Sequence, residues 1–88
     1  MYGLKSKTLT STGSVVSGPT RVVKLYLVGA SSAGSVVLKN GGAAGTVIAT
    51  FNFDVDGLSV YVPGSGILFE EGVYVDLTAT PGVTLLYT

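Results

Sequence analysis

Asn52, Asp54 and Asp56 occupy alternate positions directly before Gly57, which is how a calcium-binding loop begins. Carboxylate and amide oxygens at this spacing surround a calcium ion when a glutamate closes the loop from its far end. Here Pro63 stands at the closing position, and the flanking residues alternate as in strands. We therefore interpret the segment as an acidic hairpin turn, with a weak calcium site near Asp54 and Asp56 as the alternative.

Glu70 and Glu71 are adjacent carboxylates, and paired carboxylates can act as acid and base on one substrate bond. Adjacent residues of a strand point to opposite faces, however, so these two side chains are poorly placed to share a proton. We expect both to be solvated residues that end a strand before Gly72.

The other residue types of enzyme sites are missing or unsupported. The chain has no histidine, cysteine or tryptophan, so its serines and threonines lack their usual base and no transition-metal site is indicated. Residues 29–35 have the glycine spacing of a phosphate-binding loop, but no lysine follows the second glycine, and we expect a plain turn there. We predict a protein that is not an enzyme and uses no cofactor or small-molecule substrate.

The charged residues are divided between the two halves of the chain. All five basic residues precede Gly41 and all five acidic residues follow it, so the net charge is zero. Two interpretations stay open: the halves interleave in a sandwich and neutralise each other, or the basic half of one subunit meets the acidic half of another. The second arrangement closes into a ring such as a trimer, or docks the chain onto a larger assembly.

Four basic residues are the candidate partner-binding residues: Lys5, Lys7, Arg21 and Lys24. With Tyr2 and Tyr26 they resemble a basic, aromatic strand face that binds single-stranded nucleic acid. The zero net charge argues against nucleic acid, and lysines two residues apart are typical of an edge strand that must not pair with other chains. We expect a protein partner.

The composition favours one small domain that associates with itself or with an assembly. Of the 88 residues, 47% are hydrophobic and only 11% are charged, so much of the surface must be poor in charge. Without cysteine no disulfide can stabilise so small a core, and association is the substitute. No secretory signal or membrane span is visible, so we expect the chain to stay where it is made, without a membrane partner.

Apolar residues alternate with polar ones in short runs separated by glycine, proline and asparagine, which predicts an all-β domain. We expect a small antiparallel β-sandwich or jelly-roll-like domain of about eight short strands over residues 19–88, with residues 1–18 as an N-terminal arm or edge strand. The expected strands are 3–10, 21–28, 35–39, 46–53, 58–62, 66–70, 73–78 and 83–87.

Two of these strands support detailed predictions. Residues 46–53 should bury alternate side chains, namely Val47, Ala49, Phe51 and Phe53. Residues 21–28 are apolar on one face, with Val23, Leu25 and Leu27, and nearly apolar on the other, which indicates a central strand or one covered by a neighbouring subunit.

The order of glycine turns and strands in residues 29–42, 63–69, 74–78 and 83–87 resembles small all-β virion proteins of tailed bacteriophages, particularly those of cyanobacteria and other aquatic bacteria. The resemblance covers about two thirds of the chain and carries over no site residue. It implies a virion structural protein, made in the host cytoplasm. Its best fit is a capsid decoration or cement protein, often a homotrimer, that binds the major capsid protein or another virion protein.

Two further possibilities remain. The chain could be a tail, head-fibre or adaptor component of the virion. It could also be a glycan-binding module, in which aromatic side chains would be exposed at one end of the sandwich; the candidates are Tyr26, Tyr61, Tyr74 and Tyr87.

Overall fold

The computed structural model describes residues 4–27, 33–55, 57–62, 64, 66–78 and 82–88. Within them the chain forms nine strands and no helix, which confirms the all-β prediction. The strands are β1 (Lys5–Leu9), β2 (Gly13–Ser17), β3 (Thr20–Leu27), β4 (Gly34–Asn40), β5 (Val47–Phe53), β6 (Leu58–Tyr61), β7 (Ile67–Phe69), β8 (Gly72–Thr78) and β9 (Val83–Tyr87).

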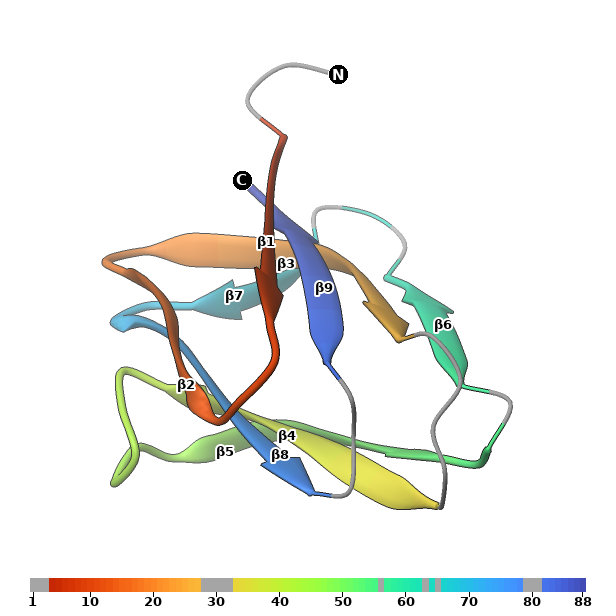
Figure 1. Cartoon of the computed structure of the whole chain (residues 1–88). Helices are drawn as coiled ribbons and strands as arrows, with labels where there is room; N and C mark the ends of the chain where they lie inside the picture. Colours follow the sequence, from red (N-terminus) through yellow and green to blue (C-terminus); the bar gives the residue numbers. More distant parts are fainter. Residues whose placement is uncertain (1–3, 28–32, 56, 63, 65, 79–81) are drawn as a thin grey trace.

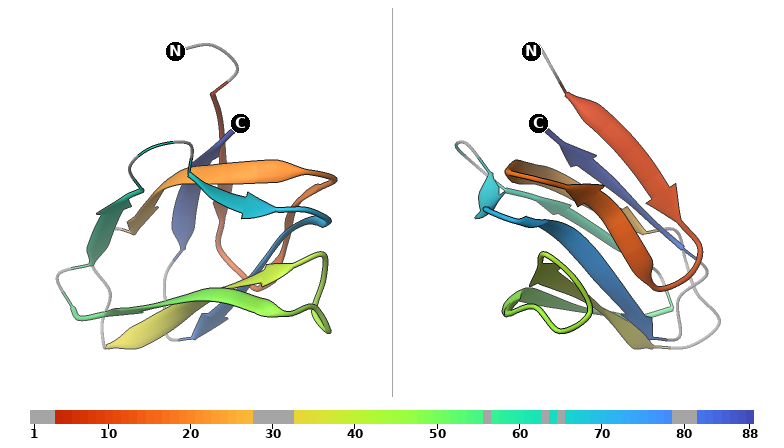
Figure 2. Two further views of the ribbon diagram at one scale, coloured as in Figure 1. Left: turned by 180° about the vertical axis from the view of Figure 1, so that it is seen from behind. Right: turned by 90° about the vertical axis from the view of Figure 1, so that its left-hand side faces the viewer.

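The strands form two antiparallel sheets packed as a sandwich (Figure 1). Sheet A has the order β1-β9-β3-β6, and β7 also pairs with β3; sheet B has the order β2-β8-β4-β5. Seen from two further sides, the sheets remain separate layers, and β1 lies at the margin of the sandwich (Figure 2). The predicted sandwich is confirmed, although the sequence did not indicate β2 as a separate strand.

The pairing of the strands is nested along the chain, as in a jelly roll. β1 pairs with β9, β2 with β8, β3 with β7 and β6, and β4 with β5, while the β3–β9 and β4–β8 pairs complete the two sheets. Every strand of the first half therefore lies beside a strand of the second half. The basic and acidic halves of the sequence interleave in space as a direct result of this order.

The core lies between the sheets and is built from the inward face of each strand. Phe69, Leu25, Leu38 and Leu85 are the largest side chains with almost no solvent exposure. The remaining members of the cluster are Val15, Val22, Leu27, Val36, Phe53, Val73, Val75 and Val83. Because the cluster draws on both sheets, it holds the two layers together.

Two register shifts change which side chains face the core. In β3 the shift lies between Val22 and Lys24, so Val22 joins the core cluster and Val23 does not. The prediction that Val23 shares the face of Leu25 is therefore wrong, whereas the prediction of a central strand is confirmed because β3 has partners on both sides. A bulge inserts one residue and moves the next side chain to the other face, which sequence alternation alone does not reveal.

The second shift affects the start of β5. It lies between Leu38 and Lys39 on β4 and places Val47 opposite Lys39, on the outer face, where Val47 is 52% exposed. The predicted burial of Val47 is wrong for this reason. Further along, Phe53 is buried, and Ala49 and Phe51 are partly buried against the core, as predicted.

The segment expected as an arm or edge strand contributes an edge strand to each sheet. β1 ends sheet A and β2 ends sheet B. Val15 of β2 belongs to the core cluster, and Leu9 of β1 packs against it. The buried apolar side chains in this segment hold it to the sandwich.

Candidate binding surface

The outer face of sheet A carries an ordered array of polar, aromatic and cationic side chains. Residues that oppose each other in adjacent antiparallel strands share one face of the sheet. One row across the sheet contains Tyr61, Lys24, Leu86 and Ser6. The next row contains Ser59, Tyr26, Thr84 and Thr8. The hydroxyl oxygens of Thr8 and Thr84 are 2.7 Å apart and share a hydrogen bond, which fixes these two side chains on the same face.

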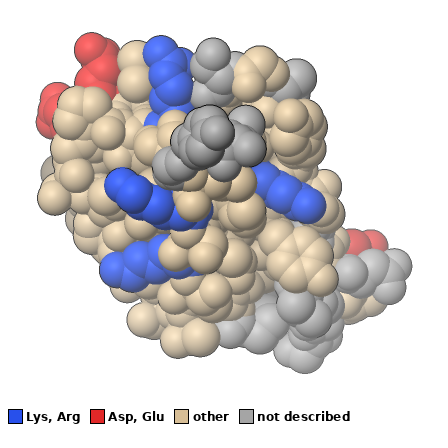
Figure 3. All heavy atoms as spheres, turned by 90° about the horizontal axis from the view of Figure 1, so that it is seen from above, with Lys and Arg blue, Asp and Glu red and all other residues tan. Residues whose placement is uncertain are grey.

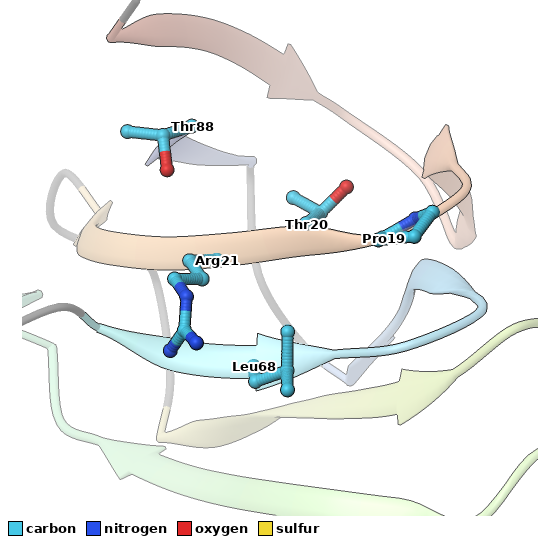
Figure 4. Close-up of a pocket in the computed structure, with 5 residues that line it drawn as sticks. All are labelled: Pro19, Thr20, Arg21, Leu68 and Thr88. Carbon is cyan, nitrogen blue, oxygen red and sulfur yellow. The ribbon is translucent and has the colours of Figure 1, made fainter.

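Arg21 extends this face toward the start of β3. It opposes Leu68 of β7, and its backbone N–H donates to the carbonyl oxygen of Thr88 at 3.1 Å. The side chains of Pro19, Thr20, Arg21, Leu68 and Thr88 line an open pocket of about 200 Å³. In Figure 4 the Arg21 side chain extends from β3 in the direction of β7, which carries Leu68. We call the outward side chains of Arg21, Lys24, Tyr26, Tyr61, Leu68 and Leu86 the sheet A patch.

The aromatic and apolar members of the sheet A patch are accessible to a partner. Tyr61 is 66% exposed, Tyr26 is 47% exposed and Leu68 is 43% exposed. Tyr61 lies directly opposite Lys24, and Tyr26 lies diagonally from Tyr61, a spacing of about 7–8 Å between strand positions. Tyrosine and arginine are enriched in protein interfaces, where an apolar ring and a charged group desolvate together.

The two cations of the sheet A patch have no acidic partner among the described residues. The ion pair found in this part of the chain joins Lys39 and Asp76, with Nζ and Oδ2 3.6 Å apart on the outer face of sheet B. Figure 3 shows the side of the molecule on which sheet A lies; lysine and arginine side chains are spread over it, and acidic side chains lie at its margins. Interleaving of the two halves therefore neutralises Lys39, whereas no ion pair within the described residues involves Arg21 or Lys24.

Lys5 and Lys7 do not join this patch. They oppose Tyr87 and Leu85, whose side chains face the core, so both lysines lie on the inward side of β1. They remain exposed because β1 is the outermost strand of sheet A. Inward-pointing charges on an edge strand prevent pairing with other chains, and this structural role accounts for their position.

The four tyrosines proposed for glycan binding are also separated by the fold. Tyr26 and Tyr61 share the sheet A patch. Tyr74 opposes Lys39 on the outer face of sheet B, and Tyr87 packs against the core. Only one pair of tyrosines is therefore placed to act together.

The acidic segments form turns in the described part of the chain. β7 ends at Phe69 and β8 begins at Gly72, so Glu70 and Glu71 lie in the turn between them, and both are exposed as predicted. The backbone N–H of Glu71 donates to Oδ1 of Asn40 at 2.9 Å, which connects this turn to the end of β4.

The suggested calcium and phosphate sites fall partly on residues that the structure does not describe. Asp54 Oδ1 accepts a hydrogen bond from the N–H of Val55 at 2.8 Å, while Asp56 lies outside the described residues. No cluster of three or more possible metal ligands occurs among the residues that were described. Residues 28–32 of the glycine loop also lie outside them, and a strand, β4, follows at Gly34.

Comparison of the chain with models of protein families, with curated protein sequences and with solved structures gave no significant match. None of the described residues belongs to a helix with the length and hydropathy needed to cross a membrane.

Leu68 and Leu86 are the members of the sheet A patch that sequence analysis did not single out. Each is one apolar residue in a short apolar strand, so its outward position depends on the register with β3. In the structure each of them lies opposite a cation, Leu68 opposite Arg21 and Leu86 opposite Lys24. This pairing cannot be recognised from the sequence before the strand register is known.

Proposed function

We propose that the chain is a non-enzymatic structural protein of a virion that binds the capsid as a decoration protein. The resemblance of residues 29–88 to small all-β phage proteins supports the virion as its location. Jelly-roll domains recur in viral capsids and in lectins, so the fold is compatible with this role but does not select it.

The observation that carries the proposal is the sheet A patch. Arg21 and Lys24 are cations without an acidic partner in the described part of the chain, and they lie beside Tyr26, Tyr61 and Leu68 on one face. The matching partner surface has carboxylates next to apolar groups. We propose that the major capsid protein supplies it, with self-association of the chain, in the trimer that the resemblance implies, as a second contact. Many weak contacts repeated by the symmetry of a shell add up to stable attachment.

The test compares two double variants that remove the same charge from opposite sides of sheet A. Arg21→Ser with Lys24→Ser removes the cations of the sheet A patch, and Lys5→Ser with Lys7→Ser removes those of β1. Each purified protein is mixed with capsid shells that lack the chain and is sedimented with them. We expect the first double variant to lose binding and the second to keep it.

The result separates two mechanisms. Equal loss in both variants would show a diffuse electrostatic attraction, and loss in the Lys5 and Lys7 variant alone would show attachment through the N-terminal segment; either result would exclude a contact centred on the patch. Failure of the unaltered chain to sediment with the shells would remove the decoration role and leave the tail, head-fibre or adaptor role.

Glycan binding is the second candidate function, favoured by the exposed pair Tyr26 and Tyr61 with the hydroxyls of Ser59 and Thr84 in the adjoining positions. Tyrosine rings stack on sugar faces while hydroxyls bond to the sugar oxygens. A glycan array probed with the unaltered chain and with Tyr61→Ser tests this function. Binding that depends on Tyr61 would support it, and an array without signal would exclude it.

A further inference from the structure

The four edges of the two sheets differ in their protection against pairing with another chain. Sheet A ends in β1 on one side and in β6 and β7 on the other; sheet B ends in β2 and in β5. An edge strand presents backbone N–H and C=O groups that can pair with a strand of a second molecule, and most proteins block this with charges, breaks or bulges.

Three of the edges carry such a block. β1 has Lys5 and Lys7 on its inward side. β2 is five residues long, and a register shift with β8 lies between Ser14 and Val16. The remaining edge of sheet A is divided between β6, with four residues, and β7, with three. β1 thus has a regular ladder of five residues that carries charges, and the other two edges offer no regular stretch of this length.

β5 is the exception. Its seven residues, Val47–Phe53, include no charged residue and no proline. Among the described residues it pairs with β4 alone. It has a register shift near its start, opposite Leu38 and Lys39 of β4, but the five residues Ala49–Phe53 pair regularly, a longer regular stretch than β2, β6 or β7 offers. Val47 and Ile48 are 52% and 40% exposed, and Ala49 and Phe51 are only partly buried. β5 therefore combines a backbone edge that no other described strand pairs with and apolar side chains that a neighbouring strand would cover.

We propose that β5 pairs antiparallel with β5 of a second copy of this chain, about a two-fold axis near Thr50, so that the two copies of sheet B become one continuous sheet. An antiparallel strand is complementary to itself, because every outward N–H on one copy meets an outward C=O on the other. The contact uses the same surface on both copies, so the pair has no free β5 edge to which a third copy could bind. The protected edges of the chain prevent growth beyond the pair.

The charges near β5 are compatible with this arrangement. With Thr50 at the centre, Asp54 of one copy lies beside Thr46 of the other. Lys39 of that other copy opposes Val47 on the adjacent strand, β4, and lies on the same outer face. Two strand spacings, about 10 Å between backbones, separate Lys39 from Asp54. Lys39 keeps its ion pair with Asp76 of its own copy, so its attraction to Asp54 acts at long range. No like charges face each other along β5 itself.

The interface does not depend on the proposed function, since it involves neither the sheet A patch nor the capsid. It also differs from a trimer interface. A chain that forms trimers elsewhere would be joined by β5 into pairs of trimers, so the number of copies is even in either case.

The first experiment measures the mass of the purified chain by light scattering across a wide range of concentration. Thr50→Lys places like charges opposite each other at the proposed axis, and Ser14→Lys is the matched control, because Ser14 is exposed on the other edge strand of sheet B. We expect an even number of copies for the unaltered chain and for Ser14→Lys. For Thr50→Lys the dissociation constant should rise by about fivefold or more.

The second experiment uses the absence of cysteine in the chain, which makes an introduced thiol unique. Opposed residues of paired strands have Cβ atoms about 4.5–5.5 Å apart, so Thr50→Cys should be joined rapidly into covalent dimers by a short bismaleimide, and Ser14→Cys should not. A chain that is a monomer or a trimer at every concentration would overturn the proposal. Equal cross-linking of Thr50→Cys and Ser14→Cys would overturn it as well.

Discussion

Gly72, the first residue of β8, lies close against the backbone of β2. Its φ is 121°, and a Cβ added there would lie 2.5 Å from the carbonyl oxygen of Val16 and 2.9 Å from Cα of Ser17. Both are backbone atoms of β2 and cannot rotate away as a side chain would. Gly72→Ala therefore requires β2 to move away from β8.

Gly18 provides a matched control. Its φ of 89° is also unfavourable for alanine, but an added Cβ would meet no atom within 4 Å. Gly18→Ala should thus cost only the backbone strain, about 1–2 kcal/mol. Gly72→Ala should cost about 2–6 kcal/mol, because the strain of its φ and the crowding against β2 each contribute about 1–3 kcal/mol. A domain of 88 residues has a total stability of about 4–13 kcal/mol, so this loss is large.

The assay is urea unfolding of the unaltered chain and the two variants, followed by circular dichroism. We predict that Gly72→Ala unfolds at a clearly lower urea concentration than Gly18→Ala. Equal losses of stability in the two variants would mean that β2 can move away from β8 without a loss of free energy. The N-terminal segment would then be a loosely attached arm, and the reasoning that places it in the sandwich would be refuted.

Three other variants test separate parts of the account. Phe69→Ala should lower the free energy of unfolding by about 3–5 kcal/mol because Phe69 has no exposed surface, whereas its exposed neighbour Leu68→Ala should change it by less than about 1 kcal/mol; urea unfolding of the pair checks this. Asp76→Asn should cost less than about 1 kcal/mol because the ion pair with Lys39 is partly exposed, and a larger loss at low salt would contradict this estimate. Tyr61→Ser should leave stability within about 0.5 kcal/mol of the unaltered chain while weakening sedimentation with capsid shells; a folded variant that binds fully would remove Tyr61 from the patch.

The fold class could be predicted because turns and alternation are local signals. The runs from Ala49 to Phe53 and from Val73 to Leu77 alternate as expected, and each contributes to the core. β2 was missed because its serines and glycine give weak apolar content, even though Val15 is buried. The faces of Val23 and Val47 were wrong because each depends on a bulge, which is set by the partner strand and not by the local sequence.

The candidate site could be predicted only in part. The division of charge along the sequence led us to place the candidate binding residues in the basic half, and Arg21 and Lys24 do lie together on one face. Lys5 and Lys7 lie on the inward side of β1, a consequence of the pairing of Lys7 with Leu85 in β9, at the other end of the chain. Leu68, too, becomes part of the surface only through its pairing with β3. Long-range register, which a single sequence does not encode locally, decides the composition of the surface.

The most direct test of the central claim is the number of copies of this chain in purified virions of the phage that would encode it, measured by quantitative mass spectrometry against the major capsid protein. A decoration protein should be present in many copies, in a simple ratio to the major capsid protein. A few copies per particle would place the chain in the tail or in fibres, and its absence from the particle would contradict the account.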